Sequence, residues 1–283
     1  MSSDFFHSCC SEFQSIQDLI CESLIQQGEV PFHEDKWNYH KGDGGGRTRV
    51  WEEGKLLEKA GVNFSGIQGG QLPPSALKAM PESAKDQPFS AAGVSLVLHP
   101  WNPFVPTIHM NIRYFECGPL WWFGGGVDLT PTYTTIEDVQ NFHRPLKDLC
   151  KTHNRDYEKF KRNCDEYFYL PHRKETRGVG GLFFDHLKED KDKDREFTMA
   201  LGTLFPSLYE PFLKKYQNEP YSNEQRDFQL LRRSRYVEFN LLFDRGTHFG
   251  IQSDGRTESI LMSMPATAKW KYNHKLSLRC SFR

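Results

Sequence analysis

The chain has 283 residues, which allows one large domain or two small ones. Aromatic residues make up 14% of it, enough to build a sizeable core and to line a pocket for a large ring. The formal net charge of -1 argues against a nucleic-acid partner, because such binding depends on neutralising phosphates with basic residues. No apolar run reaches membrane-spanning length, and the N-terminus lacks a basic segment followed by an apolar one, so we expect neither stable membrane insertion nor export.

The cysteines are odd in number and scattered, with no CxxC pair and no paired metal-ligand spacing. This pattern predicts buried, reduced thiols in a cytoplasmic protein. It also excludes the CxxxCxxC signature of radical enzymes that hold an iron–sulfur cluster. The seven positions are Cys9, Cys10, Cys21, Cys117, Cys150, Cys164 and Cys280.

The first predicted element is an amphipathic helix over residues 4–27, with Asp4 as its cap and Gly28 as its stop. Short strand signals follow over 34–72, with a hairpin whose tip is the glycine run 42–46. No GK[ST] sequence and no helix follow this run, so we do not interpret it as a nucleotide-binding loop. A short helix is expected at 75–80.

The rest of the chain mixes strands with separate helices. Strands are predicted within 91–133 and near 182–184, and helices over 135–150, 155–170, 192–217 and 222–234. We expect 236–247 to form a strand that turns at 244–246, and 248–265 to form a second strand pair with a turn at 253–255. No linker-like composition break occurs. The pattern therefore predicts an α+β fold with a single domain over 1–283.

The stretch 107–116 is the most informative strand. Successive side chains of a strand point to opposite faces, so His109, Asn111 and Arg113 share one face. Ile108, Met110, Ile112 and Tyr114 share the other face, which is suited to packing under helices.

The next strand has the same period, and it places Gly124, Gly126 and Asp128 on one side. Glycine weakens a strand, and a common reason for it is the close approach of a ligand or another backbone. We interpret the region as a sheet face cleared for a flat, anionic ligand, with Arg113 for carboxylates and Asp128 for N–H donors. The alternative is an ordinary solvated face. The apolar neighbouring strand and the adjacent Trp121 and Trp122 argue against that alternative.

Several long blocks resemble the oxygen-dependent coproporphyrinogen-III oxidase family. The resemblance covers about residues 10–274, with the blocks in the family's order. They are HPWNPFVPTIHMNIRYFE, WWFGGGVDLTPTY, FHR at 142–144, YVEFNLLFDRGT and GRTESILMSMP.

The resemblance implies a large, mostly antiparallel β-sheet flanked by α-helices on both faces, and a homodimer whose interface includes 236–271. It implies the oxidative decarboxylation of two propionates of coproporphyrinogen III to vinyl groups, which gives protoporphyrinogen IX, CO2 and H2O2. Molecular oxygen would be the co-substrate, and no organic cofactor is expected. Members of the family continue further beyond the position of Trp270 than this chain does.

The resemblance also implies roles for individual residues. His109 matches the assigned proton donor, and Asp128 matches a carboxylate implicated in catalysis. The matched substrate-binding positions are Ser95, Asn111, Ile112, Arg113, Asp254, Gly255 and Arg256. Family members usually have glycine where this chain has Asp254.

Residue chemistry supports these roles and leaves alternatives. Arginine suits carboxylates because it stays charged and binds them bidentately, so we nominate Arg113 and Arg256 first and Arg245 third. For Arg245 the alternative is a turn contact or an ion pair with Asp244. Imidazole titrates near neutrality, so His109 can pass a proton, although it could instead be a hydrogen-bonded structural residue.

Two further alternatives concern function. Bacterial relatives have been assigned a divalent metal at positions that match His99, His109, His143 and His172. The sequence shows no local ligand spacing to support such a metal site. A tetrapyrrole carrier without catalytic activity would use the same pocket. Asp128→Asn separates the carrier from the enzyme, because a carrier should keep binding whereas an enzyme should lose turnover.

Overall fold

The protein is described from a computed structural model of residues 1–283, of which 1–3, 73–76, 78–79, 253–254 and 274–283 are left undescribed. Its centre is one antiparallel sheet with the strand order β1-β2-β3-β4-β5-β6-β9. The strands are β1 His33–Asn38, β2 Asp43–Glu52, β3 Leu57–Gly69, β4 Phe89–Pro100, β5 Thr107–Cys117, β6 Leu120–Thr130 and β9 Gly181–Leu187. A separate small ladder pairs β7 (Tyr169–Leu170) with β8 (Glu175–Thr176).

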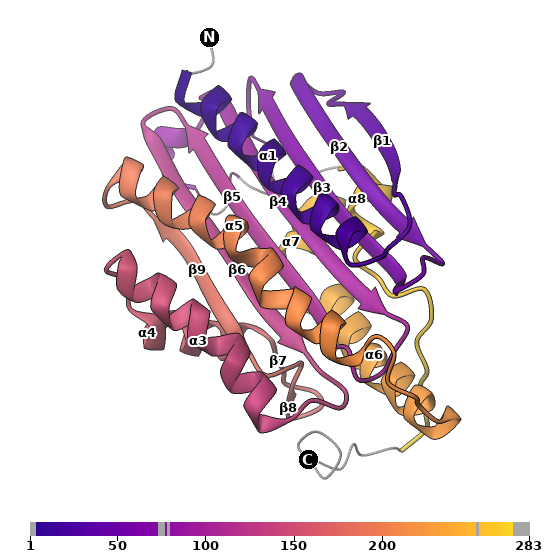
Figure 1. Ribbon diagram of the computed structural model, residues 1–283. Coiled ribbons are helices and arrows are strands. Elements are labelled where there is room, and N and C mark those ends of the chain that lie inside the picture. The colour runs from indigo at the N-terminus through magenta and orange to yellow at the C-terminus, as the bar shows by residue number, and fades with distance from the viewer. Residues whose placement is uncertain (1–3, 73–76, 78–79, 253–254, 274–283) are drawn as a thin grey trace.

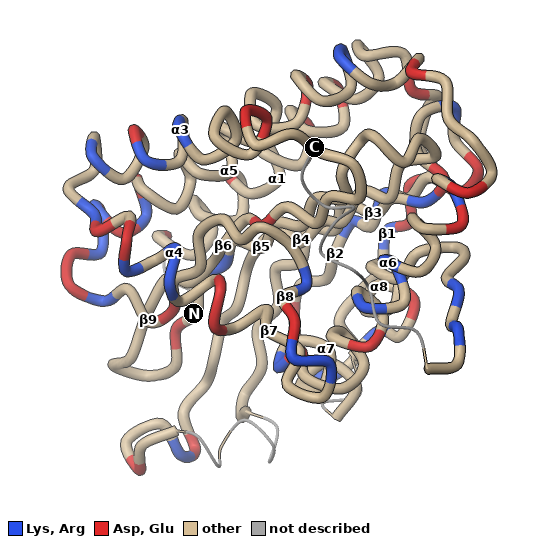
Figure 2. The backbone as a smooth tube through the Cα atoms, turned by 90° about the horizontal axis from the view of Figure 1, so that it is seen from below, with Lys and Arg blue, Asp and Glu red and all other residues tan. Residues whose placement is uncertain are grey.

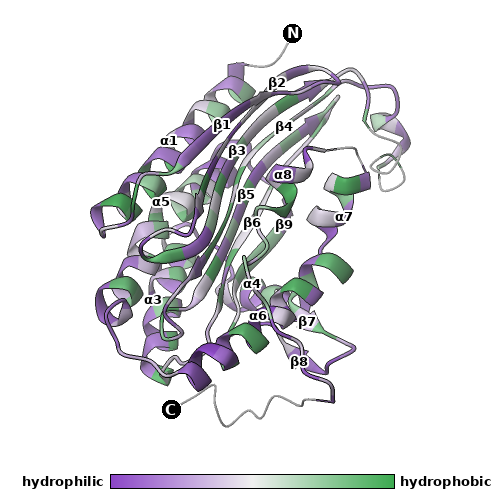
Figure 3. Cartoon of the chain, turned by 90° about the vertical axis from the view of Figure 1, so that its right-hand side faces the viewer, coloured by the Kyte–Doolittle hydropathy of each residue, from purple (hydrophilic) through white to green (hydrophobic). Residues whose placement is uncertain are grey.

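Helices cover both faces of the sheet, which confirms the expected α+β architecture (Figures 1 and 3). Figure 3 shows α1, α3 and α5 on one side and α6, α7 and α8 on the other. The helices are α1 Asp4–Gln26, α3 Ile136–Thr152, α4 Tyr157–Tyr167, α5 Lys191–Tyr216, α6 Asn223–Leu242, α7 Arg245–Gln252 and α8 Thr257–Leu261. Among the described residues, one 3-10 turn, η1, spans Glu82–Ala84. Figure 2 shows Lys and Arg interspersed with Asp and Glu along the chain.

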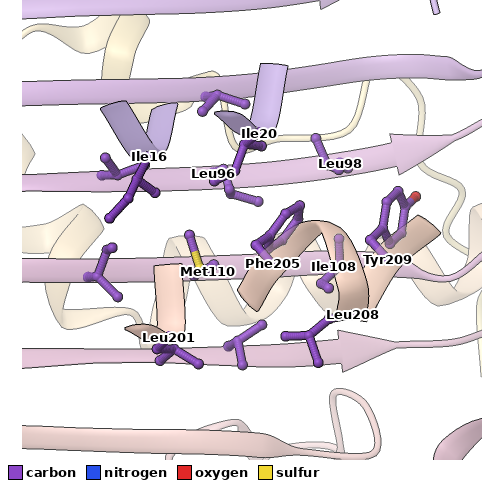
Figure 4. Packing of buried hydrophobic residues seen from close by; sticks show 14 of the residues in the cluster. Ile16, Ile20, Leu96, Leu98, Ile108, Met110, Leu201, Phe205, Leu208 and Tyr209 are labelled. Atoms are coloured by element: carbon purple, nitrogen blue, oxygen red, sulfur yellow. The ribbon is translucent and has the colours of Figure 1, made fainter. Parts of the chain in front are cut away.

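The main core lies between the sheet and the α1–α5 layer. α1 contributes Ile16 and Ile20, and α5 contributes a row of buried side chains one helical turn apart. The alternate residues of the central strands face them, as the period of two predicted. Figure 4 shows this packing, with Ile16, Ile20, Leu96, Leu98, Ile108, Met110, Leu201, Phe205, Leu208 and Tyr209. Burying one face of the sheet in this way fixes which side chains remain on the other.

The glycine run of the first hairpin belongs to a strand and not to a flexible tip. β2 begins at Asp43, and Gly46 pairs with Trp37 of β1. A side chain on Gly46 would collide with the Trp37 ring, so glycine is required there by a close approach within the protein. Gly46 therefore accommodates a tryptophan, and the glycines at 44–46 belong to β2 and do not form a loop.

The predicted strand at 236–247 is wrong. α6 continues through it to Leu242, with Tyr236 and Phe239 both buried. These residues favour strands by intrinsic propensity, but spaced three apart they share one face of a helix that packs on the protein. No glycine or proline interrupts the chain from 221 to 245, which was the sequence signal for an unbroken helix.

The predicted strand pair at 248–265 is also wrong, because the described part of this stretch contains α7 and α8. The expected turn at 244–246 is the start of α7. Asp244 accepts hydrogen bonds from the Thr247 backbone N (2.7 Å) and Oγ1 (2.8 Å), as a helix-capping residue does. The capping pattern Asp-x-x-Thr was present in the sequence. The expected turn at 253–255 lies partly outside the described residues.

The remaining sequence predictions fall into two groups. The strands within 91–133 and near 182–184 and the helices over 4–27, 135–150, 155–170 and 192–217 are confirmed with small shifts at their ends, and the helix over 222–234 is confirmed but extends to Leu242. The short helix at 75–80 and the C-terminal segment from 274 lie mostly or wholly outside the described residues. Within the described part of the chain, no helix is both long and apolar enough to cross a membrane. Six cysteines of that part are free thiols.

Candidate active site

The register of the central strands brings the predicted residues side by side. His109 pairs with Asp128, Asn111 with Gly126 and Arg113 with Gly124 across β5 and β6. On the other flank, Ser95 of β4 pairs with Asn111. We call the face that carries these side chains the site face. It lies opposite the α1–α5 core layer, because Ile108, Met110 and Ile112 point into that core.

At one end of the site face, His109 and Asp128 form a hydrogen-bonded pair. Their Nδ1 and Oδ1 atoms are 2.8 Å apart, and Asp128 is almost fully buried, with 2% of its surface exposed. Burial by itself raises the pKa of the Asp128 carboxyl, but the charge of Arg177 and the bond from His109 outweigh it and hold the pKa below its ordinary value. Asp128 is therefore ionised at neutral pH.

The ionised carboxylate decides the tautomer of His109. A carboxylate only accepts hydrogen bonds, so the Nδ1 atom of His109 carries the proton. No hydrogen bond from the described residues reaches Nε2, and the His109 side chain is 23% exposed. Nε2 is thus the ring atom that a ligand on the site face can meet. The Phe168 ring meets the imidazole edge-on at 5.9 Å between centroids and restricts its rotation.

The second oxygen of Asp128 is bound by Arg177, a residue that the sequence analysis missed. Arg177 Nη2 donates to Asp128 Oδ2 at 2.6 Å, and the Arg177 side chain is 1% exposed. Its guanidinium lies 3.9 Å from the ring centre of Phe168, 4.5 Å from that of Tyr236 and 4.8 Å from that of Phe239. Burial lowers the pKa of Arg177, but the Asp128 charge more than offsets this. A buried cation enclosed by aromatic rings gives no local sequence pattern, so only the fold could reveal it.

Further along the site face, Arg113 is bound by two neighbouring side chains but keeps N–H groups that these bonds do not use. Its Nη1 donates to Asn111 Oδ1 and its Nη2 to Asp185 Oδ1, each at 2.8 Å. A guanidinium has five N–H groups, so Arg113 keeps donors for a ligand, and 36% of its side chain is exposed. Asp185 of β9 was also missed. The period of that strand places it on the face of Phe183, but only the pairing of β9 with β6 shows which face this is.

Arg245 approaches the same acid from α7. Its Nη2 lies 3.9 Å from Asp185 Oδ2, and its guanidinium lies 4.9 Å from the ring centre of Tyr167. The expected alternative, an ion pair with Asp244, is not found, because Asp244 caps α7. Arg245 therefore stands beside Arg113, with 65% of its side chain exposed.

The other predicted residues lie at different places. Arg256, just before α8, is ion-paired with Asp35 of β1 and does not contact Arg113. β1 and β5 are four strand spacings apart, about 19 Å. Gly255 adjoins Arg256, and Asp254 lies outside the described residues. The Ile112 side chain is fully buried on the opposite face, so a ligand on the site face could meet only its backbone.

The four histidines of the metal alternative do not converge. His99 bonds Ser263 O through Nε2, and His143 bonds Val179 O and the Tyr157 hydroxyl. His172 bonds Glu238 at 2.8 Å from the β7–β8 turn. No group of three or more ligating side chains that could hold a metal occurs among the described residues. These residues therefore do not fit a shared metal site.

A hydrogen-bonded His–Asp pair and guanidinium groups lie together on one face of the sheet, an arrangement typical of the active site of an α+β enzyme. Comparison with known proteins gives its family. Residues 9–281 match the family described as coproporphyrinogen III oxidase.

Curated relatives agree with this match. The chain is 55% identical to the oxygen-dependent coproporphyrinogen-III oxidase of Dictyostelium discoideum, over 93% of this chain and 86% of that protein. It is 48% identical to the oxygen-dependent coproporphyrinogen-III oxidases of Prochlorococcus marinus (strain NATL1A) and Synechococcus sp. (strain CC9605). These matches cover 92% of this chain and 82% and 79% of the two relatives.

The chain therefore belongs to the coproporphyrinogen III oxidase family. It is an oxygen-dependent oxidoreductase of haem biosynthesis.

Proposed function

We propose that the protein removes carbon dioxide from two propionates of coproporphyrinogen III and leaves vinyl groups, giving protoporphyrinogen IX. Each propionic acid arm, R–CH2–CH2–COOH, reacts with one O2 to give R–CH=CH2, CO2 and H2O2, so atoms and electrons balance. The observation that carries the proposal is the placement of the His109–Asp128 pair and Arg113 on one face of the sheet. The molecule acted on must offer both an acidic arm and a site for proton transfer.

Arginines hold the acidic arms in this proposal. Arg113 has donors left after its bonds to Asn111 and Asp185, and Arg245 lies beside it. A guanidinium binds a carboxylate with two parallel hydrogen bonds, which fixes the direction of the arm. Arg256, with Gly255, takes an arm farther across the sheet, and Ser95 contacts the macrocycle beside Asn111. Asp254, which lies outside the described residues, is proposed as a further substrate contact.

His109 supplies the proton that reduced oxygen needs. Its Nε2 donates when the imidazole is charged, and Asp128 stabilises that charge through Nδ1–H. Asp128 also has a second proposed role, accepting N–H groups of the macrocycle and assisting pyrrole deprotonation. Because Arg177 and His109 already occupy one site on each Asp128 oxygen, any pyrrole N–H would use the remaining lone pairs.

Oxygen reacts directly with the substrate in this scheme. Deprotonation makes the pyrrole electron-rich, and the resulting anion can reduce oxygen itself. We therefore propose that the enzyme needs no organic cofactor. Within the protein, the residues that support this step are those that hold a proton or a charge at the macrocycle, namely His109, Asp128 and the arginines.

We further propose a cytoplasmic homodimer of single-domain subunits that span 1–283, with an interface that includes 236–271. Supporting this interface, several large apolar side chains of the described part of that segment are exposed: Leu241, Leu242, Phe249, Ile251 and Trp270. Analytical ultracentrifugation tests the dimer. A monomer at micromolar concentration would contradict it.

The function is tested by incubating the purified protein with coproporphyrinogen III in air and under strict anaerobiosis. We expect protoporphyrinogen IX, with two CO2 released per ring, only in air. Product without oxygen would contradict the oxidant assignment. Binding without turnover in air would favour a tetrapyrrole carrier, and unchanged rates after exhaustive chelation would argue against a required metal.

A further inference from the structure

Asp185 lies between the two arginines at the open end of the site face. Its Oδ1 accepts from Arg113 Nη2 at 2.8 Å, and its Oδ2 lies 3.9 Å from Arg245 Nη2. Arg113 comes from β5, Asp185 from β9 and Arg245 from α7. One carboxylate thus joins two cations that the chain brings from distant positions, with Asp185 itself only 21% exposed.

β6 lies between Arg113 and Asp185, and the position that they cross on this strand is Gly124, which has no side chain. A Cβ added at this position would lie 2.8 Å from Asp185 Oδ1 and 2.9 Å from Arg113 Nη2. The ion pair therefore crosses β6 directly above this glycine. The cleared patch that the sequence suggested for a ligand is occupied here by the Arg113–Asp185 pair.

Arg245 has its own support on the far side of the acid. Its guanidinium lies 4.9 Å from the Tyr167 ring centre and 5.9 Å from that of Phe183. The Tyr167 and Phe183 rings are stacked, with centroids 4.4 Å apart and an angle of 9° between their planes. Tyr167 also accepts a hydrogen bond from the Arg245 backbone N at 3.1 Å. The stacked rings therefore lie against the guanidinium of Arg245, which Asp185 also attracts.

We propose that Asp185 is a positioning residue that holds Arg113 and Arg245 together so that they grip the acidic arms of the substrate. This inference rests on the proposed function. Two cations and one anion leave a net positive charge for an arriving carboxylate, and both arginines keep unused N–H groups.

Two opposing effects decide what Asp185 does to substrate binding. Its negative charge repels a substrate carboxylate, but solvent at this partly exposed site screens that repulsion. Asp185 also restricts the side chains of Arg113 and Arg245, through a hydrogen bond to the first and an ion pair with the second. Without Asp185, these two side chains would lose that conformational entropy when the substrate binds, which would weaken binding. Solvent weakens the repulsion between Asp185 and the substrate more than it weakens the restriction of the two arginines. We therefore expect positioning to dominate.

The test is the steady-state kinetics of Asp185→Ala and Asp185→Asn with coproporphyrinogen III. We expect Asp185→Ala to raise KM about tenfold while kcat changes less than twofold, because Asp185 bonds neither His109 nor Asp128. Asp185→Asn should raise KM less, since its amide oxygen can still accept from Arg113. In an Arg245→Ala background the Asp185→Ala effect should shrink, because one of the two positioned groups is gone.

Gly124→Ala is a second, independent variant, because its methyl group pushes the Arg113–Asp185 pair apart without removing the Asp185 carboxylate. It should reproduce the rise in KM. The matched control is Glu210→Gln, which removes an acid paired with Lys214 on α5, on the opposite face of the sheet. This control should leave both KM and kcat unchanged.

Several outcomes would overturn the inference. An unchanged or lower KM in Asp185→Ala would show that Asp185 only neutralises the charge of the two arginines and does not position them. A fall in kcat and melting temperature with constant KM would show a purely structural role. If Asp185→Ala does not fold, Gly124→Ala decides the matter by the same criterion. Absence of turnover by the wild-type protein would instead refute the proposed function, so the two failures are distinguishable.

Discussion

The two ends of the site face differ in how completely their charges are enclosed. At the closed end, Asp128 and Arg177 are 2% and 1% exposed, and both Asp128 oxygens are bound. At the open end, Arg113 and Arg245 are 36% and 65% exposed and keep spare donors. Both ends consist of arginine, aspartate and aromatic rings, so the two ends differ in exposure to solvent and not in residue types.

The difference follows from solvent access. A buried ion pair is costly to disturb, because removing one partner leaves the other charged and desolvated. Such a pair can hold His109 in one tautomer and one orientation. At the open end, water screens the charges, and both arginines keep N–H groups that an arriving carboxylate can reach. In the proposed function, proton transfer therefore belongs to the closed end and recognition of the acidic arms to the open end.

Asp128→Asn should break the closed end most severely. The amide cannot stabilise a charged His109, so we expect kcat to fall about a thousandfold with much less change in KM. Single-turnover kinetics and substrate titration measure the two quantities. The double variant Asp128→Asn/His109→Asn should be no slower than either single variant, because the two residues act as a unit. Additive losses would contradict this coupling.

Arg177→Met should destabilise the fold, because it leaves the Asp128 carboxylate buried without its cation. We expect the free energy of unfolding to fall by about 3 kcal/mol, measured by urea denaturation at neutral pH. Adding Asp128→Asn to this variant should restore part of the loss. A drop below about 1 kcal/mol would mean that water reaches the pair, and the distinction between the two ends would fail.

Glu238 of α6 supports the closed end from behind. It accepts from His172, Arg173 and Trp270, and Arg177 follows the turn that carries the first two. Burial raises its pKa, but these donors outweigh burial and lower it to about 2 from 4.5. A lowered folded-state pKa stabilises the fold above the ordinary pKa, and the contribution is lost as pH falls from about 4.5 to about 2.

The variant Glu238→Gln tests this contribution. The free energy of unfolding should fall between pH 5 and pH 2.5 in both proteins, but in the variant the fall should be smaller by on the order of 2 kcal/mol. Chemical denaturation at the two pH values gives the difference. Glu166→Gln, at an exposed position of α4 that forms none of these contacts, is the matched control. Equal acid sensitivity of wild type and Glu238→Gln would show that the cluster does not couple to folding.

Arg113→Lys should give the smallest effect, at the open end. Lysine keeps the charge but cannot bind a carboxylate bidentately, so we expect KM to rise about tenfold and kcat to stay within threefold. Arg144→Lys, on the exposed side of α3, is the control that should change neither. A collapse of kcat in Arg113→Lys would mean that recognition and proton transfer are not separated along the sheet.

Local pattern predicted the sheet well. The period of two placed His109, Asn111 and Arg113 on one face, and the pairing with β6 confirmed that Asp128 faces the same way. The pattern failed where packing overrides propensity. Tyr236 and Phe239 favour strands but lie on a helix, because their rings enclose Arg177.

The sequence by itself determined the α+β class, the family and the alternation that turns one face of β5 and β6 away from the α1–α5 core. Only the tertiary structure decided the partners: Arg177 for Asp128, and Asp185 for both Arg113 and Arg245. Alternation is a property of neighbouring residues along a strand and can be read locally. An ion pair between residues 49 or more positions apart depends on how strands and helices meet, and no local pattern contains that information.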